Sequence, residues 1–275
     1  MINRTLSRFA THENSAYPSL WRGCVGAWCP SLGPSGSRLH DYSRRNSWGT
    51  LTNMDPATDW IVSGGAYALD FDGTNDNVTT LSTFAPGAGP MTVAYWHDGR
   101  NTAQFNMHVT QRPASFNSAV HSTWGIGQGN YLIAPANTLR IGALYYTPSG
   151  YRIFLSDSNY ADKWRHYAFT VDGASLVVYV DGESIAGTVT PSGGWPNIPD
   201  TSAIAIGASQ DGTLASLAYM DDVRIYNRVL SRGELRLLAR RRGIAFTPRT
   251  RASGTPEQAA AATNRRRRLI CGSQC

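Results

Sequence analysis

Alternating apolar and polar residues between Asp162 and Gly187 predict three short strands joined by two tight turns. From His166 to Val171 large apolar side chains occupy every second position, the period expected of a strand with one buried face. Asp172-Gly173 ends this run, and Asp-Gly readily adopts the positive φ angles of a tight hairpin. Leu176–Val180 is apolar on both faces and is predicted to lie inside a sheet, before Asp181-Gly182 turns the chain again. Such a meander needs a second layer to cover it.

Similar short patterns run through most of the chain and predict a protein built of strands. Gly, Pro and Asp-Gly sequences separate these patterns, as is typical of a sandwich with many turns. Strands are predicted at 23–29, 66–72, 77–81, 91–97, 105–110, 123–126, 131–133, 139–144, 151–155, 203–207 and 217–226. A short helix is predicted after the last strand, because Ser231 and Glu234 form a capping box and Gly243 provides a stop.

Three segments carry a resemblance to a known fold. The V-D-G at 171–173 with the L-V-V-Y-V-D-G run after it, the F-D-G turn within Ala68–Val78, and Met220–Ser231 resemble strands of the laminin-G-like, or concanavalin A-like, jelly roll. They lie in the order of that family and span roughly residues 23–238. The resemblance implies an all-β fold, a two-sheet antiparallel jelly-roll sandwich. The short C-terminal helix and two extended arms, which follow from the capping box and from composition, complete the predicted architecture. It says little about function, because this fold hosts lectins, glycosidases, adhesion modules and structural domains.

Positive charge is concentrated near the C-terminus. The formal net charge of the 275 residues is +6, and Lys163 is the only lysine. Without nine arginines of the C-terminal part the remaining chain is slightly acidic. These nine are Arg240, Arg241, Arg242, Arg249, Arg251, Arg265, Arg266, Arg267 and Arg268. We therefore divide the chain into an N-terminal arm (1–20), a laminin-G-like jelly roll (21–243) and an Arg-rich C-terminal arm (244–275).

Several classes of protein are disfavoured by the sequence. No apolar run approaches the roughly 20 residues that span a membrane, and the N-terminus lacks the apolar region of a secretory signal. Cys24 and Cys29 lie in one predicted strand and are expected on opposite faces, so they should not bridge. Together with Cys271 and Cys275 they are expected to be free thiols, or a disulfide in the tail, since their spacing differs from that of paired zinc ligands.

Among the acidic residues, Asp221 is the strongest candidate for a metal ligand. Its position in the 217–226 pattern matches that of Leu217, Val223 and Ile225, so it is expected to point into the core, where a carboxylate needs a partner. In related β-glucanases an aspartate at the matching position helps to bind a structural Ca²⁺, and Asp72 and Asp76 are further oxygen ligands that such an ion could use. The alternative is that Asp221 accepts hydrogen bonds from backbone N–H groups at a bulge and that Asp72-Gly73 is only a turn.

Catalysis is not expected. Glycosidases need two carboxylates that flank the cleaved bond, and the chain has no E-x-D-x-x-E or E-x-D-x-E run. Sugar binding needs exposed aromatic rings, for which Trp48, Trp96, Trp124 and Trp195 are candidates. Trp96 and Trp124 lie in strand patterns, so Trp195, in a Gly- and Pro-rich loop, is the preferred glycan contact.

The arginines of the tail are interpreted as a docking arm. They lack the interleaved aromatic residues of a nucleic-acid platform, so nucleic acid is disfavoured as a partner. The chain resembles stand-alone laminin-G-like proteins from the structural genes of tailed phages, which implies a non-enzymatic protein at the virion surface, made in the host cytoplasm. Its arms would contact capsid or other virion proteins through Arg249, Arg251 and Arg265–Arg268, and a homo-oligomer is compatible with this. The alternative is a carbohydrate-binding lectin module in adhesion to glycans.

Overall fold

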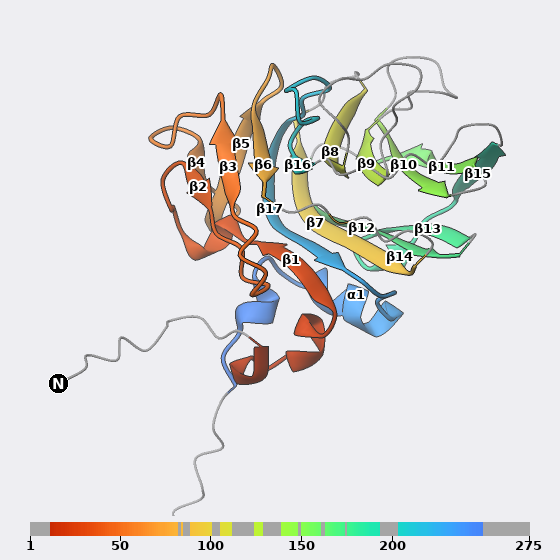
Figure 1. Cartoon of the computed structure of the whole chain (residues 1–275), viewed down its shortest axis with the longest axis horizontal. Helices are drawn as coiled ribbons and strands as arrows, with labels where there is room; N and C mark the ends of the chain where they lie inside the picture. Colours follow the sequence, from red (N-terminus) through yellow and green to blue (C-terminus); the bar gives the residue numbers. More distant parts are fainter. Residues whose placement is uncertain are drawn as a thin grey trace, which may run out of the picture.

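Two antiparallel β-sheets face each other in the computed structural model (Figure 1). The structure describes residues 12–81, 84, 89–100, 105–111, 124–128, 139–147, 150–160, 163–173, 175–192 and 203–249. Within these residues one sheet has eight strands and the other has nine. The predicted all-β, two-sheet sandwich is therefore confirmed. The strand predicted at 131–133 lies outside the described residues.

The order of the strands shows how distant parts of the chain are brought together. The eight-stranded sheet runs β14 (Glu183–Ser184), β13 (Ser175–Val180), β12 (Arg165–Asp172), β7 (Met91–Gly99), β17 (Leu217–Tyr226), β5 (Ala66–Asp72) and β4 (Trp60–Ser63), and β1 (Cys24–Trp28) also pairs with β17. The nine-stranded sheet runs β15 (Gly187–Ser192), β11 (Gly150–Asn159), β10 (Arg140–Thr147), β9 (Trp124–Gln128), β8 (Asn106–Gln111), β16 (Ile204–Ile206), β6 (Asn77–Thr80), β3 (Gly49–Thr52) and β2 (Arg38–Leu39). Short helices are η1 (His12–Asn14), η2 (Pro18–Trp21), η3 (Pro30–Leu32), α1 (Arg232–Leu238) and η4 (Ile244–Phe246).

The meander predicted from the sequence forms β12, β13 and β14. Gly173 at the first turn has a φ of 57°, and Asp181 and Gly182 at the second have φ values of 52° and 82°. These positive angles explain why both turns use Asp-Gly. β13 lies between β12 and the two-residue β14, so it is inside the sheet as predicted, although one of its faces is only half-buried.

The main core lies between the two sheets and follows the period-two pattern of the strands. Val93 and Tyr95 of β7, Phe169 of β12 and Ile126 of β9 all point into it and are buried. Trp28 of β1 is also in this core, and its indole Nε1 donates a hydrogen bond of 2.7 Å to the carbonyl oxygen of Ser47.

A second apolar cluster covers the outer face of the eight-stranded sheet. We call it the terminal cluster, because the two ends of the described chain supply most of it. Its members include Leu20, Trp21, Tyr226, Leu230, Leu235, Leu238, Ile244, Ala245 and Phe246, all buried. Figure 1 shows the red N-terminal helices and the blue C-terminal segment together on this side of the sheet. Burial of these side chains stabilises the position of both chain ends.

The described parts of both predicted arms therefore belong to the folded domain. Ser15 Oγ donates a hydrogen bond of 2.6 Å to the carbonyl oxygen of Ala245, and Trp21 Nε1 donates one of 3.1 Å to the same oxygen. The backbone N–H of Arg249 donates to the carbonyl oxygen of Asn14 at 3.0 Å. The boundaries predicted at residues 20 and 243 thus cut through a packed unit. The prediction that the arms lie against another chain and not against their own sandwich is wrong for residues 12–20 and 244–248, whereas docking by the exposed side chain of Arg249 stays a prediction. Residues 1–11 and 250–275 are outside the description.

Strand β17 changes the face that it presents to the core at Asp221. Met220 points inward before this residue, and Val223 and Ile225 point inward after it. The register shifts between Asp221 and Arg224, and Asp222 has a φ of 48°. The predicted regular alternation is therefore wrong for the first half of the strand, because one bulge reverses it.

The helix prediction is confirmed, and the cysteine prediction needs a correction. Ser231 and Glu234 form the reciprocal capping box of α1. Cys24 and Cys29 are free, as expected, but both lie in the terminal cluster on the same side, because β1 has a bulge after Cys24. No helix within the described ranges is long and apolar enough to cross a membrane.

Candidate functional site

An exposed tryptophan lies at the β2–β3 edge of the nine-stranded sheet. Trp48 directly precedes β3 and is 37% exposed. The guanidinium carbon of Arg38 lies 5.4 Å from the centroid of its ring, and the ring of His40 lies 5.7 Å away, centroid to centroid. Arg38 and His40 are themselves exposed. We call these three residues the Trp48 surface.

Strand pairing explains why these three side chains meet. Arg38 pairs with Thr50, and Leu39 pairs with Gly49. Because side chains alternate across a strand, Arg38 and His40 share the outer face while Leu39 turns into the core. A Cβ atom at Gly49 would lie 2.4 Å from Val78 Cγ1, so only glycine fits beside Trp48 at this position.

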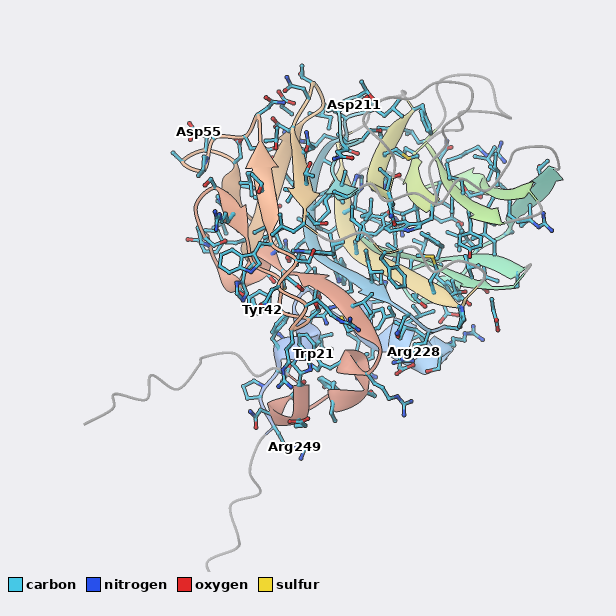
Figure 2. All side chains as sticks on the ribbon, in the orientation of Figure 1. Trp21, Tyr42, Asp55, Asp211, Arg228 and Arg249 are labelled. Atoms are coloured by element: carbon cyan, nitrogen blue, oxygen red, sulfur yellow. The ribbon has the colours of Figure 1, made fainter. Side chains whose placement is uncertain are left out.

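A series of aromatic contacts joins the Trp48 surface to the terminal cluster. The ring centroids of His40 and Tyr42 are 4.6 Å apart, and those of Tyr42 and Phe246 are 5.0 Å apart. Phe246 in turn contacts Trp21 edge-on, with centroids 5.0 Å apart. Figure 2 shows Tyr42 and Trp21 at the same end of the molecule, near Arg249.

The Trp48 surface combines chemical groups that are suited to contact with a sugar ring. An indole face provides a flat apolar area, and its edge is polar. Arg38 adds fixed N–H donors with a positive charge, and His40 adds a ring nitrogen that either donates or accepts. A sugar ring has a similar division, with C–H groups on its faces and hydroxyl groups around its rim.

Asp221 is fully buried, as predicted, and its partners belong to the protein. Its Oδ1 accepts hydrogen bonds from the backbone N–H groups of Ser31, at 2.9 Å, and Asp222, at 2.7 Å. Its Oδ2 lies 3.6 Å from Nε of Arg242. Burial, with the neighbouring charge of Asp222, raises the pKa of Asp221 to about 7. This arrangement matches the alternative interpretation, an aspartate that accepts backbone N–H groups at a bulge.

The three aspartates considered as calcium ligands do not form one site. Asp72 pairs with Leu217, four residues along β17 from Asp221, which corresponds to about 13 Å of strand. Asp72 and Asp76 form a local turn, in which Asp76 accepts the N–H of Asp72 at 3.0 Å. Within the described part of the chain no group of three or more His, Cys, Asp or Glu residues is arranged to hold a metal ion. The positive charge of Arg242 beside Asp221 also disfavours a cation there, so these residues do not fit Ca²⁺.

A polar pair in the core was not expected from the sequence. His97 of β7 and His108 of β8 stack across the two sheets, with ring centroids 3.7 Å apart. The hydroxyl group of Tyr95 lies 2.8 Å from Nδ1 of His108. Burial lowers the pKa of His97 to about 3 and holds that of His108 well below its usual value. The sequence did indicate the position of His97, because in the alternation of this strand it falls on the same inward face as Val93 and Tyr95.

The other predicted site residues have different outcomes. Trp124 is fully buried, and Trp96 is half-buried and donates a hydrogen bond to the carbonyl oxygen of Leu238 at 3.3 Å. Arg249 is exposed at the end of the described chain. Trp195, Arg251, Arg265, Arg266, Arg267 and Arg268 lie outside the described residues, so their roles stay predictions. Trp48 was one of four candidates, and Arg38 and His40 were missed because only strand pairing places them beside it.

Comparisons with known proteins agree with this fold. Residues 72–236 match the model of the concanavalin A-like lectin/glucanases superfamily. No curated protein matches. Among solved structures, Trypanosoma rangeli sialidase in complex with the inhibitor DANA is 18% identical with a TM-score of 0.56, over 78% of this chain and 32% of that chain. The botulinum neurotoxin serotype D ligand-binding domain in complex with N-acetylneuraminic acid is 13% identical with a TM-score of 0.56, over 82% and 52%.

These structural similarities establish the fold alone, and this chain spans only about a third to a half of the proteins concerned. The family match covers more than half of the chain and confirms the resemblance found in the sequence motifs. The chain belongs to the concanavalin A-like lectin/glucanases superfamily.

Proposed function

We propose that this protein is a non-catalytic carbohydrate-binding protein whose sugar contact is centred on Trp48. The observation that carries the proposal is the exposure of Trp48 between Arg38 and His40 on a lectin-like sandwich. An aromatic ring of this size, with polar groups at its edge, supplies both apolar contact and orientation. The positive charge of Arg38 favours a sugar with a carboxylate group. Two proteins of similar fold are described in complex with sugars: Trypanosoma rangeli sialidase with sialic acid, and the botulinum neurotoxin serotype D ligand-binding domain with N-acetylneuraminic acid.

The roles of the glutamates support binding without catalysis. Glycoside hydrolysis needs two carboxylates placed on either side of the bond that is cleaved. Glu183 forms ion pairs with Arg232 and Arg236, and Glu234 caps α1 and pairs with Arg228. Both glutamates therefore hold α1 in position, which favours a structural role for them over a role in acid and base catalysis. The chain has only two others, Glu13 and Glu257.

A glycan array with wild-type protein and Trp48→Ala tests the proposal. We expect the variant to lose its glycan signals by about tenfold, because removing the ring removes roughly 1.4 kcal/mol of contact. The matched control is Tyr67→Ala, since Tyr67 is 36% exposed and belongs to the eight-stranded sheet. Tyr67→Ala should bind as the wild type does. Equal signals from wild type and Trp48→Ala would refute a role for this surface, and Trp195→Ala in the same array tests the other predicted contact.

We also propose that the protein works at the surface of a larger particle, such as a virion. The backbone of Arg249 is fixed to Asn14 while its side chain is exposed. The Arg-rich sequence that follows is therefore joined to the domain at a defined point, which suits a tether to an acidic partner. Many weak contacts by such a tether add up when several copies bind one assembly.

Removing residues 250–275 should detach the protein from particles without unfolding it. The deletion removes Arg251 and Arg265–Arg268 and keeps the packed residues up to Arg249. Co-sedimentation with particles measures attachment, and thermal melting measures folding. Attachment of the full chain should weaken as salt is raised, because exposed charges are screened. Full attachment of the shortened chain would contradict the docking role of the tail.

A further inference from the structure

The loop that joins β2 to β3 continues the Trp48 surface. The two strands pair antiparallel, so residues 40–48 form the connection of a hairpin. Trp48 lies at the base of this loop, and Arg44 and Arg45 lie at its middle with exposed side chains. Arg38, on β2, lies at the strand end of the hairpin, 5.4 Å from the centroid of the Trp48 ring. Along the hairpin, positive charges therefore stand both before and after the ring.

A buried aspartate holds this loop in a fixed conformation. The carboxylate of Asp41 accepts hydrogen bonds from the backbone N–H and the hydroxyl group of Ser43, both at 2.8 Å, and from the N–H of Ser47 at 3.0 Å. It also accepts the N–H of Ala27 on β1 at 3.1 Å, which ties the loop to the other sheet. The backbone that carries the loop arginines is thus ordered before a ligand arrives, which lowers the entropic cost of binding.

The middle of the loop has a strained backbone. Arg44 has a φ of 71° and Asn46 has a φ of 55°, in the left-handed region that side chains other than glycine rarely adopt. Asparagine tolerates this region better than arginine does. Such conformations cost free energy and are found most often at binding and active sites. A glycine would fit this backbone more easily, so an arginine at position 44 indicates a use for its exposed side chain.

The positive charges of the hairpin are not neutralised by neighbouring acids. Within the ranges that the structure describes, none of Arg38, Arg44 and Arg45 forms an ion pair with a carboxylate. Exposed arginines elsewhere do so, as Arg232 does with Glu183. The hairpin therefore offers guanidinium groups whose N–H donors are open to an anionic ligand.

We propose that the β2–β3 hairpin binds a linear polysaccharide that carries carboxylate groups on successive sugars. This inference rests on the proposed function of the Trp48 surface and names its class of ligand. One sugar ring contacts the indole of Trp48, and the carboxylates on either side of it accept hydrogen bonds from Arg38 and from the loop arginines. Arginine suits this role, because its planar N–H groups match a carboxylate.

The length of the hairpin favours a chain of sugars over a single sugar. Arg45 precedes Trp48 by three residues, so their Cα atoms lie within about 11 Å of each other. A short oligosaccharide spans such a distance. A single acidic sugar has one carboxylate and can use the cations on only one side of the ring, whereas a chain with repeated carboxylates uses both.

Trigalacturonate, its methyl ester and galacturonate are the probes. Trigalacturonate carries a carboxylate on every sugar, the methyl ester has the same sugars without the charges, and galacturonate is a single acidic sugar. Isothermal titration with the full chain measures each dissociation constant. We expect trigalacturonate to bind about tenfold more tightly than galacturonate, because each further exposed charge pair contributes a few-fold. The methyl ester should lose this gain.

Arg44→Gln combined with Arg45→Gln separates the loop from the ring. This double variant should bind trigalacturonate roughly fivefold more weakly and galacturonate as the wild type does, because a single sugar needs only the Trp48 surface. Arg22→Gln combined with Arg240→Gln is the matched control. It removes two exposed arginines outside the hairpin, keeps the same net charge as the test variant, and should bind as the wild type does. The Arg-rich C-terminal sequence is identical in all these proteins, so its attraction for anions cancels in the comparison.

The outcomes separate this inference from the proposed function. Equal dissociation constants for trigalacturonate and galacturonate, or for trigalacturonate and its methyl ester, would overturn the inference and leave the proposed function standing. Wild-type affinity of the Arg44→Gln, Arg45→Gln variant for trigalacturonate would do the same, as would an equal loss in both double variants, which would mean that net charge alone attracts the ligand. Trp48→Ala that binds trigalacturonate and galacturonate as the wild type does would instead refute the proposed function, and this inference with it.

Discussion

Replacing Phe246 with alanine should lower the free energy of unfolding by about 3–5 kcal/mol, the usual cost of removing a buried phenylalanine. Phe246 is only 2% exposed and contacts both Trp21 and Tyr42. It also lies against the guanidinium group of Arg224, 5.1 Å from the ring centroid. Its loss therefore opens a cavity beside a buried ion pair. Urea unfolding measures the change as a shift of the midpoint at constant slope.

Two truncated variants test the same segment. Ending the chain after Gly243 also removes Ile244 and Ala245, so it should destabilise more than Phe246→Ala does. Ending it after Arg249 should leave the midpoint unchanged. Val62→Ala, at an exposed position of β4, is the point-mutation control and should cost less than about 0.5 kcal/mol. A Phe246→Ala midpoint equal to that of Val62→Ala would show that the C-terminal segment does not stabilise the domain.

Acid should destabilise the wild-type protein more than a double variant, His97→Gln with His108→Gln. A histidine has a pKa of about 6.5 when unfolded, whereas burial lowers the pKa of His97 to about 3 and holds that of His108 well below its usual value. Between these values the unfolded state binds protons that the folded state does not. The contribution of the two neutral histidines to the free energy of unfolding is therefore complete above pH 6.5 and is lost as the pH falls. One histidine accounts for about 1.4 kcal/mol per pH unit, so His97 alone loses on the order of 3 kcal/mol of stability between pH 6.5 and 4, and His108 adds to this loss.

The comparison must be made between the two pH profiles, because other groups act in the opposite direction. Burial raises the pKa of Asp221 to about 7 and that of Asp76 to about 6, so protonation of these carboxyl groups favours the folded state as the pH falls. Both are present in wild type and variant, and their effect cancels in the difference. His40→Gln, at an exposed position, is the control. Parallel profiles for wild type and double variant would contradict the assignment of acid sensitivity to this pair.

The parts of the fold that were predictable from the sequence are those fixed by neighbours along the chain. The β12–β13 hairpin is specified by an alternating strand and an Asp-Gly turn, and α1 is specified by its capping box. The bulge at Asp221 and Asp222 was not predictable, because both halves of β17 have acceptable alternation and only the pairing with β7 reveals the shift. Local sequence patterns do not predict such shifts in strand register.

Contacts between distant parts of the chain also explain why the sequence did not predict the burial of the C-terminal segment or the neighbours of Trp48. Residues 244–249 begin with only three apolar residues, too few to predict burial, and their burial depends on Trp21, more than 200 residues away along the chain. Trp48 could be named as a candidate from its residue type, but its neighbours Arg38 and His40 follow from the β2–β3 register alone. Sites assembled from such distant parts require the tertiary structure.

The hydrogen bond between Arg249 and Asn14 gives the described chain an almost circular course. Residues 12 and 249 leave the domain side by side, so a short linker between them would close the chain into a ring without disturbing either sheet. New ends could then be opened at the exposed Asp172-Gly173 turn, as circular permutation is tolerated where termini are adjacent and the opened loop is exposed. For the same reason the domain has the connectivity of a cassette that can be inserted into a surface loop of another protein, with the Trp48 surface still facing solvent.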